Sequence, residues 1–477
     1  MAEFQYAERN YSRSLFHAGE EIQWKKASAF VNFYNEQDNK NRSLQQSLSD
    51  ADKLLLANVG DTLSKAVISG ATESDYNNND VFYLKQDTVV NSIYYNPIYV
   101  FSQNEDSINY TVRFSYVGYN KGYYRQKASA ANGRVYEWVA PINGIQQGAY
   151  EPVIQIVTPK QNQMLTAGVN LSVTPNNTVT IEGVYTKNNI NTFSSADKGN
   201  DEGSGLKIKS LNVKKLKSDS SNTSFIYNVN YEFIQKNFQQ IERFRTAEFD
   251  RDWNRSLTGQ IFNDQHIGQI NLGLIKTNHF FGIYDFNSFI EGKTYEGLKH
   301  QINSGFKSNT FNSFFKGSYL TTKDNFFRSK FYRHNSMAEQ TIGKFKVAYS
   351  DVFENNIFID DSLNELLSRS YQFWEWEGSI SSVDTSNVYF KLFYKERRDK
   401  QAYNDEIKDS TFATNVGVKA TINYFRNHPI SILSTYRELD LKNTVSSLLK
   451  PDNTLINRLE YNPRLFKGMM VLGVFYE

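Results

Sequence analysis

The stretch FATNVGVKATINY (412–424) alternates between apolar and polar side chains over 13 residues. With Thr414 as the one interruption, every second residue is apolar: Phe412, Val416, Val418, Ala420, Ile422 and Tyr424. A repeat of two predicts a β-strand with one apolar and one polar face. Strands in globular proteins are commonest at about 5–6 residues, whereas a strand that crosses a bilayer needs about 9–11. The stretch therefore favours a transmembrane-type strand.

The same alternation recurs throughout residues 161–477. Clear examples lie at 165–173, 225–233, 311–319, 388–394 and 466–476. The link KSDSSN (217–222) is short, whereas residues 191–204 form a long polar connection, and this asymmetry is typical of outer-membrane barrels. We expect roughly 14–18 long strands, mostly joined as hairpins, and a mainly β fold: a large antiparallel up-and-down transmembrane-type β-barrel, or a fragment of one.

The N-terminal part of the chain divides into barrel strands and an insert. Residues 1–37 hold two strand candidates, with His17, Ala18 and Gly19 in their connection. Residues 38–160 form an inserted helical and β-sandwich-like domain, and residues 161–477 supply the remaining antiparallel β-barrel strands.

The insert begins with a predicted helix. Its apolar residues recur at helical spacing: Leu44, Leu48, Ala51, Leu55 and Val59. Ser43 is the predicted N-cap and Gly60 the predicted C′ residue. We expect a second short helix over 61–69 and then short strands, since Asn-Gly turns and prolines punctuate residues 132–160.

Composition excludes several functional classes. The 477 residues include 53 basic and 51 acidic side chains, so the net charge of +2 gives no electrostatic basis for binding nucleic acid. The absence of cysteine excludes disulfides, zinc–thiolate sites and cysteine nucleophiles. No run approaches 18 apolar residues, so the sequence predicts no transmembrane helix. The mean hydropathy of −0.58 is compatible with a barrel, because barrel strands are polar at every second position.

The start of the chain, MAEFQYAERNY, lacks the apolar core of a signal peptide. The last residues lie within an alternating pattern. We therefore expect either a protein that is not exported or, preferably, a fragment or trimmed version of a larger barrel.

Few residues suggest chemistry. The six histidines are scattered, without metal-ligand spacing on a helix: His17, His266, His279, His300, His334 and His428. Asp250, Asp252 and Asn254 resemble the start of an EF-hand loop, but Arg255 replaces the required glycine and Ile261 the glutamate at position 12. We interpret this segment as a charged connection, in which Arg243, Arg245 and Arg251 pair with Glu248, Asp250 and Asp252.

One pair of carboxylates needs an explanation. Glu375 and Glu377 share a strand face and lie about 7 Å apart, a separation compatible with an inverting glycosidase. Charges facing a water-filled barrel interior explain them better, and the same applies to Lys391, Lys395 and Arg397. No nucleotide-binding loop or nucleophile elbow is present. We therefore expect no enzyme and assign no catalytic, cofactor-binding or metal site.

Four runs resemble a known family: AEFQYAERNYSRS (2–14), NGRVYEWVAPINGIQQGAYEPV (132–153), FRTAEFDRDWN (244–254) and NRLEYN (457–462). They are similar to very large, poorly characterised outer-membrane-type β-barrel proteins of Bacteroidota. The resemblance covers most of the chain and implies a cell-envelope location and a barrel longer than this chain supplies. It carries over no catalytic residue, and no plug motif of TonB-dependent transporters is recognisable.

The sequence thus predicts a protein of the cell outer membrane that acts as a pore, or as a scaffold for envelope transport or assembly. Its expected partners are outer-membrane lipid and other envelope proteins, not nucleic acid. The alternative is a secreted or surface-attached soluble β-sheet protein that binds glycans or partner proteins. The two differ in where mid-strand apolar side chains point: outward as a band about 25 Å tall in a barrel, or into a shared core in a sandwich.

Overall fold

The computed structural model describes residues 12–40, 48–77, 80–102, 104–105, 107–129, 131–216, 222–255, 263–383, 388–422, 429–441, 452–465, 470–471 and 473–476. The chain divides into two compact units. The first comprises residues 1–18, 33–164 and 186–202, and the second comprises residues 19–32, 165–185 and 203–477. No described helix combines the length and apolar character that crossing a membrane would require.

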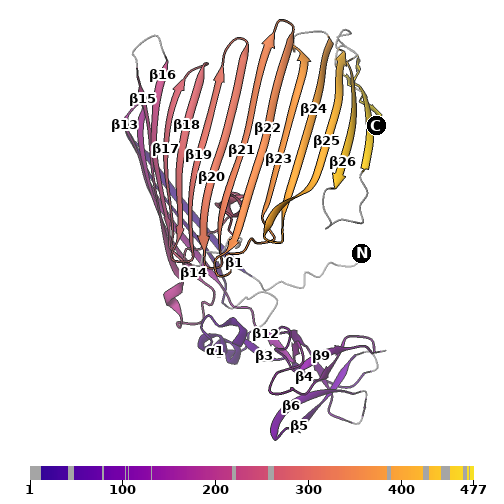
Figure 1. Ribbon diagram of the computed structural model, residues 1–477. Helices are drawn as coiled ribbons and strands as arrows, with labels where there is room; N and C mark the ends of the chain where they lie inside the picture. Colours follow the sequence, from indigo (N-terminus) through magenta and orange to yellow (C-terminus); the bar gives the residue numbers. More distant parts are fainter. Residues whose placement is uncertain are drawn as a thin grey trace. The chain divides into compact units, whose positions relative to one another are not determined.

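The second unit is built on an antiparallel sheet with 18 strands in the described part of the chain (Figure 1). The strands are β1 (Arg13–Gln23), β2 (Ala27–Asp38), β13 (Gln161–Thr174), β14 (Asn177–Asn189), β15 (Glu202–Lys215), β16 (Thr223–Ile234), β17 (Gln265–Lys276), β18 (Phe280–Glu291), β19 (Tyr295–Lys307), β20 (Phe311–Asp324), β21 (Phe327–Ile342), β22 (Phe345–Asp360), β23 (Tyr371–Ser382), β24 (Val388–Tyr403), β25 (Glu406–Ile422), β26 (Ile430–Leu441), β27 (Asp452–Tyr461) and β30 (Val474–Tyr476). A separate two-stranded sheet joins β28 (Arg464–Leu465) and β29 (Met470–Val471).

Neighbouring strands in the sequence are neighbours in the sheet. From β15 to β27 each strand pairs with the next, and β30 pairs with β27. β2 pairs with both β1 and β13. The predicted hairpin order is therefore confirmed, but among the described residues no ladder joins β1 to β27 or β30, so closure of the predicted barrel is not found.

The two faces of the sheet differ sharply. Register partners on one face of β22 to β25 are Val347, Ile380, Leu392 and Val418. Register partners one residue away, on the opposite face, are Lys346, Ser381, Lys391 and Lys419. The first face is called the outer face and the second the inner face. Val418 and Leu392 are 46% and 47% exposed, so these apolar side chains do not pack into a protein core.

Residues 412–422 of the alternating stretch FATNVGVKATINY belong to β25, which begins six residues before Phe412 and ends at Ile422. Residues 423–424 lie outside the described residues. One prediction about the first hairpin is wrong. His17, Ala18 and Gly19 lie inside β1, and the turn comes later, where the amide N of Trp24 and the carbonyl O of Ala27 are 2.7 Å apart.

The first unit contains short elements. They are α1 (Asp50–Asn58), the 3₁₀ helix η1 (Leu63–Lys65), β3 (Val67–Ser69), β4 (Ala71–Glu73), β5 (Phe82–Val90), β6 (Ile93–Ser102), β7 (Tyr110–Val112), β8 (Ser115–Tyr116), β9 (Tyr124–Lys127), β10 (Val135–Trp138), β11 (Tyr150–Glu151), β12 (Val153–Gln155) and the 3₁₀ helix η2 (Lys198–Asn200). Two four-stranded sheets have the orders β4-β7-β5-β6 and β10-β9-β11-β8.

A tyrosine core joins these two small sheets. Tyr83 and Tyr99 come from the first sheet, Tyr124 and Tyr136 from the second, and all four are buried. Each sheet also donates a backbone N–H to a tyrosine of the other: Tyr136 to the Tyr83 hydroxyl (2.9 Å) and Tyr99 to the Tyr124 hydroxyl (2.8 Å). Burial without a partner would cost each hydroxyl about 1–3 kcal/mol, so these bonds make the polar rings compatible with a core.

Helix α1 begins later than predicted. Ser49, not Ser43, is its N-cap, because Ser49 Oγ accepts from the amide of Asp52 while the Asp52 carboxylate accepts from the amide of Ser49. Residues 41–47, including Ser43 and Leu44, lie outside the described residues. The predicted second helix is reduced to η1, because β3 follows it and pairs with β12.

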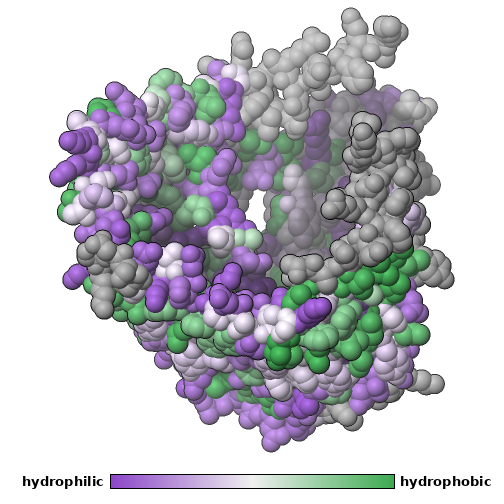
Figure 2. All heavy atoms as spheres, turned by 90° about the horizontal axis from the view of Figure 1, so that it is seen from above, coloured by the Kyte–Doolittle hydropathy of each residue, from purple (hydrophilic) through white to green (hydrophobic). Residues whose placement is uncertain are grey.

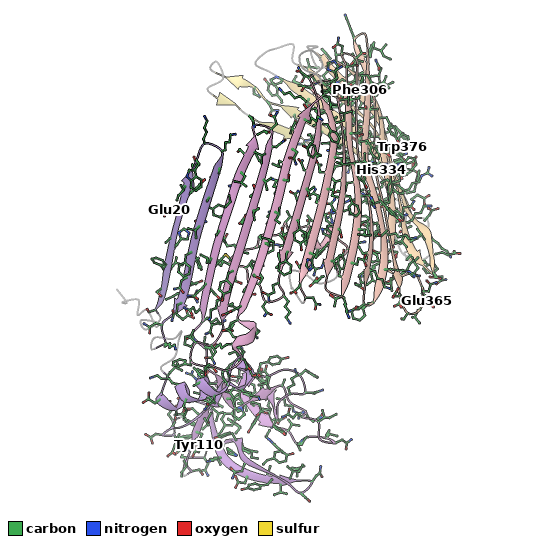
Figure 3. All side chains as sticks on the ribbon, turned by 90° about the vertical axis from the view of Figure 1, so that its left-hand side faces the viewer. Glu20, Tyr110, Phe306, His334, Glu365 and Trp376 are labelled. Carbon is green, nitrogen blue, oxygen red and sulfur yellow. The ribbon has the colours of Figure 1, made fainter. Side chains whose placement is uncertain are left out.

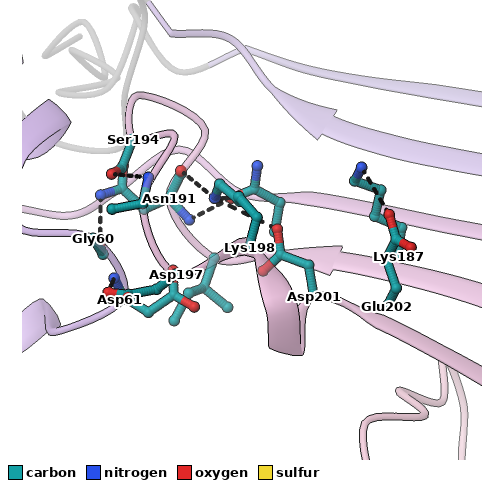
Figure 4. A network of polar contacts seen from close by, with 12 residues as sticks. Gly60, Asp61, Lys187, Asn191, Ser194, Asp197, Lys198, Asp201 and Glu202 are labelled. Atoms are coloured by element: carbon teal, nitrogen blue, oxygen red, sulfur yellow. Dashed lines mark hydrogen bonds and ion pairs between the residues drawn. The ribbon is translucent and has the colours of Figure 1, made fainter.

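The C-terminus of α1 is held by the link between β14 and β15 (Figure 4). Asn191 Nδ2 donates to the carbonyls of Leu56 and Gly60, both at 2.8 Å, and Ser194 Oγ donates to the carbonyl of Ala57 at 2.9 Å. These bonds satisfy carbonyls that a helix end leaves unpaired. Gly60 has φ +59°, as predicted for a C′ residue, and a Cβ there would come within 2.2 Å of Asp197 Oδ2.

Candidate functional site: the inner face and the link 235–264

Charged side chains on the inner face of β23 and β24 form ion pairs. Lys395 lies 2.7 Å from Glu375, and Lys391 lies 2.5 Å from Glu377. Arg397 contacts Asp399 at 2.9 Å. The two glutamates thus lie on the predicted face, and each carboxylate is bound to a lysine.

Amides continue this polar wall on β16 to β18. Asn228 donates to Asn271 (3.1 Å), and Asn271 donates to Asp285 (2.7 Å). Asn230 donates to Gln269 at 2.9 Å. The inner face is therefore a network of cross-strand polar contacts, as expected for a surface that lines water.

Part of the link between β16 and β17 packs against this face. It contains the short helix α2 (Phe249–Asp252), followed by Trp253. The Trp253 ring lies 5.4 Å from that of Phe289, and the Tyr295 hydroxyl donates to the Trp253 carbonyl. Leu320 and Phe331 complete the buried cluster. Register places these strand residues on the inner face.

Polar contacts fix the next two residues of the link. Asn254 and Asn356 exchange reciprocal amide bonds of 2.8 and 3.0 Å, and Asn254 also donates to Ser329 at 2.9 Å. Arg255 is buried and lies 2.5 Å from Glu291. Removing one member of a buried hydrogen-bonded pair leaves its partner unsatisfied, so these contacts hold the link firmly.

The ion pairs of the link differ from those predicted. Among the described residues, the predicted contact between Arg251 and Glu248 is found, at 3.2 Å. Asp252 binds Arg333 at 2.8 Å, and Arg245 binds Glu232. Burial lowers the pKa of the Arg245 guanidinium, an effect that Glu232 opposes. The charged groups pair with the strands because the link folds onto the inner face instead of lying exposed.

These contacts show that the inner face is concave. Residues 245–255 contact strands from β16 (Glu232) to β22 (Asn356). The contacts with these two strands come from Arg245 and Asn254, which are nine positions apart in the chain. The sheet therefore curves around the link, and Figure 2, which looks along the strands, shows a hollow with hydrophilic side chains around it.

Tyrosine–histidine pairs recur on the outer face. The distance from the tyrosine hydroxyl to histidine Nδ1 is 2.8 Å for Tyr231–His266, 2.7 Å for Tyr284–His300 and 3.1 Å for Tyr332–His334. The three tyrosines and three histidines of these pairs, together with Trp374 and Trp376, are called the aromatic belt. Figure 3 shows His334 and Trp376 between Phe306 and Glu365, which lie toward opposite ends of the strands.

Ser336, His334 and Asp351, on the outer face, are the residue types of a hydrolase triad, but they are not arranged as one. His334 Nε2 lies 2.9 Å from Asp351 Oδ2, and Ser336 Oγ donates to Asp351 Oδ1. A triad requires the histidine between serine and carboxylate, whereas here the carboxylate lies between the other two. The cluster therefore lacks an activated serine.

The remaining candidates are dispersed. Asp250, Asp252 and Asn254 contact Arg255, Arg333 and Asn356, respectively, and do not converge as calcium ligands would. His17 is in β1, His279 is in the turn after β17, and His428 lies outside the described residues. Within the described ranges, no three His, Asp or Glu side chains form a group that could hold a metal ion.

The partners of the link could not be identified from the sequence, although the link itself could. Glu291, Arg333 and Asn356 lie 36, 81 and 102 residues from the link residues that they contact. Each occupies a polar inner position of its strand, and nothing distinguishes it there from neighbouring polar residues.

No protein-family model matches the sequence, and no curated protein matches it. Among solved structures the chain is similar to OmpTdeltaL8, a loop L8 deletion mutant of OmpT, an outer membrane protein of Vibrio cholerae. The match covers 64% of this chain and 92% of that chain, at 10% identity and a TM-score of 0.28. A TM-score this low adds nothing to the geometry above.

Proposed function

We propose that the protein is a β-barrel of the bacterial outer membrane, with its outer face against lipid and its inner face lining an aqueous path. The observation that carries this proposal is the contrast between the two faces of the same strands. The outer face exposes apolar residues at mid-strand, whereas the inner face carries paired charges and amides. No catalytic step is proposed.

The height of the apolar band supports the membrane location. From Phe412 to Ile422, about 3.4 Å per residue and a tilt of about 45° give about 24 Å, close to the about 25 Å of a barrel's apolar band. The belt's tyrosine, tryptophan and histidine side chains suit the boundary between lipid and water. The soluble alternative would require these mid-strand residues to share a core, and they are exposed instead.

The link supports a constricted path. Its described residues 235–255 occupy part of the concave side, and their anchors come from strands β16 to β22. Trp253, Asn254 and Arg255 supply the buried contacts. We propose that this segment narrows the path and that its anchors set the size of the solute that passes.

Single-channel recording in planar bilayers tests the proposal. The double variant Trp253→Ala/Asn254→Ala removes the apolar and amide anchors, and it should release the link and raise the conductance above that of the wild type. Asn415→Ala is the matched control, because Asn415 lies on the inner face opposite Lys395 and is not among the residues that contact the link. Its conductance should stay at the wild-type level.

Three results would contradict the proposal in different ways. Channels of equal conductance in all three proteins would show that the link does not narrow the path. A protein that resists an alkaline carbonate wash yet gives no channels would favour the scaffold role. A protein that the wash releases would overturn the membrane location itself.

A further inference from the structure

A cavity opens on the outer face of β22 to β25, next to the aromatic belt. Its volume is about 440 Å³, within the range of about 300–1,000 Å³ that small-molecule sites occupy. One row of register partners crosses it: Phe353, Trp374, Arg398 and Phe412. The Arg398 guanidinium lies 5.2 Å from the centre of the Phe412 ring. This row combines apolar rings with one cation.

The next row is polar and lies farther from the apolar band. Gln372, Lys400 and Asp409 are register partners there, and all three line the cavity. Lys400 Nζ lies 3.2 Å from Asp409. The cavity walls therefore offer two cations and one carboxylate, which is a zwitterionic arrangement.

Arg398 can bind a further anion. Its contact with Glu396 Oε1, at 2.6 Å, uses Nε, one of five guanidinium donors, and its side chain is 52% exposed. The Glu396 side chain is 7% exposed, and Glu396 is the register partner of the belt residue Trp376. Arginine and lysine together suit a phosphate, which accepts several charge-assisted hydrogen bonds.

The position of the cavity identifies the source of the phosphate. On the side away from the polar row, the outer face continues through Trp376 and Glu396 to Tyr349, Tyr394 and Val416, and then to the exposed valines and leucines of the band. Such a gradient from charge through aromatic rings to apolar residues matches the head group, interface and acyl region of a lipid. Asp409 complements a cation attached to the phosphate.

We propose that this cavity binds a phospholipid whose head group is phosphoethanolamine. Arg398 and Lys400 contact the phosphate, Asp409 contacts the ammonium group, and the acyl chains lie along the apolar band. The proposal rests on the outer face lying against lipid, as proposed above.

Native mass spectrometry of the full chain in detergent tests this site, with phosphatidylethanolamine, phosphatidylglycerol and phosphatidylcholine added separately. The wild type should retain phosphatidylethanolamine in preference to the other two. Arg398→Ala/Lys400→Ala should weaken its retention about tenfold, the loss expected from removing charge-assisted hydrogen bonds. Arg328→Ala/Lys330→Ala is the matched control: it removes the same charges from the outer face of β21, away from the cavity.

Asp409→Asn sharpens the test of the head group. It should reduce the preference for phosphatidylethanolamine over phosphatidylglycerol while leaving retention of phosphatidylglycerol unchanged. Equal retention of the three lipids by the wild type, or equal losses in the two double variants, would overturn the site but not the membrane location. A wild-type protein that retains none of the three lipids would likewise overturn the site, whereas release by the alkaline carbonate wash would overturn the membrane location on which the site rests.

Discussion

Tyrosine rings in the insert point into a core between two sheets, whereas many tyrosine rings of the large sheet lie on its outer face. Tyr83 is 1% exposed and bonded to a backbone amide, and Tyr436 on the outer face of β26 is 43% exposed. Both occupy alternating strand positions. The comparison shows that alternation places side chains on one face of a strand, whereas the sheet as a whole decides whether that face is covered by protein or left exposed.

Replacing Tyr83 and Tyr436 by alanine should give the largest difference in stability between two variants. Tyr83→Ala removes a ring that packs between Phe101 and Phe114, and we expect a loss of about 3–5 kcal/mol in the first unit. Tyr436→Ala should cost less than about 1 kcal/mol in detergent, because its ring is half-exposed. Hydrogen–deuterium exchange of the full chain, followed in peptides from residues 80–151 and 430–441, measures both. Similar losses of protection would contradict the comparison.

A charge placed on the outer face should cause the next largest loss of stability. Val418→Arg should destabilise the protein in lipid vesicles by about 2–4 kcal/mol, the cost of arginine near the middle of a bilayer. Thr421→Arg is the control, because Thr421 lies on the inner face, two positions from Lys419. Urea titration of the reconstituted proteins measures the difference. If both arginines cost the same, the two faces of β25 do not differ in their contact with lipid.

Removing the Tyr83 hydroxyl alone should have a smaller effect at neutral pH than Tyr83→Ala or Val418→Arg. Tyr83→Phe leaves the Tyr136 amide without its acceptor, at a cost of about 1–3 kcal/mol. It should also change the alkaline pH dependence. Burial raises the pKa of Tyr83 to about 12, so between pH 10 and 12 the unfolded chain loses a proton that the folded chain retains, and stability falls as pH rises.

Near-UV circular dichroism across that alkaline range compares the variant with the wild type. The wild-type insert should lose stability more steeply than Tyr83→Phe, since phenylalanine has no proton to lose. Parallel curves would show that Tyr83 ionises equally in the folded and unfolded chains.

The hairpin order and the two-faced strands were predictable, because both depend on a repeat of two that each strand displays by itself. The start of α1 was also encoded locally: Ser49 and Asp52 form the capping box, although Ser43 and Leu44 extended the helical spacing further. The position of the link was not predictable, because Asn254 meets Asn356 only after the sheet has curved. The cavity on β22 to β25 likewise depends on cross-strand register, which aligns Arg398 with Trp374 and Phe412.

The reciprocal amide bond between Asn254 and Asn356 has a consequence for the order of assembly. The two residues are 102 positions apart, and β17 to β22 lie between them in the chain. The bond cannot form until β22 has added to the growing sheet, and closing so long a chain segment before then would cost entropy without return. The link can therefore dock in steps: the contacts of Trp253 and Arg255 with β18 need 36 residues of intervening chain, whereas the amide bond to Asn356 is added after β22 has joined the sheet.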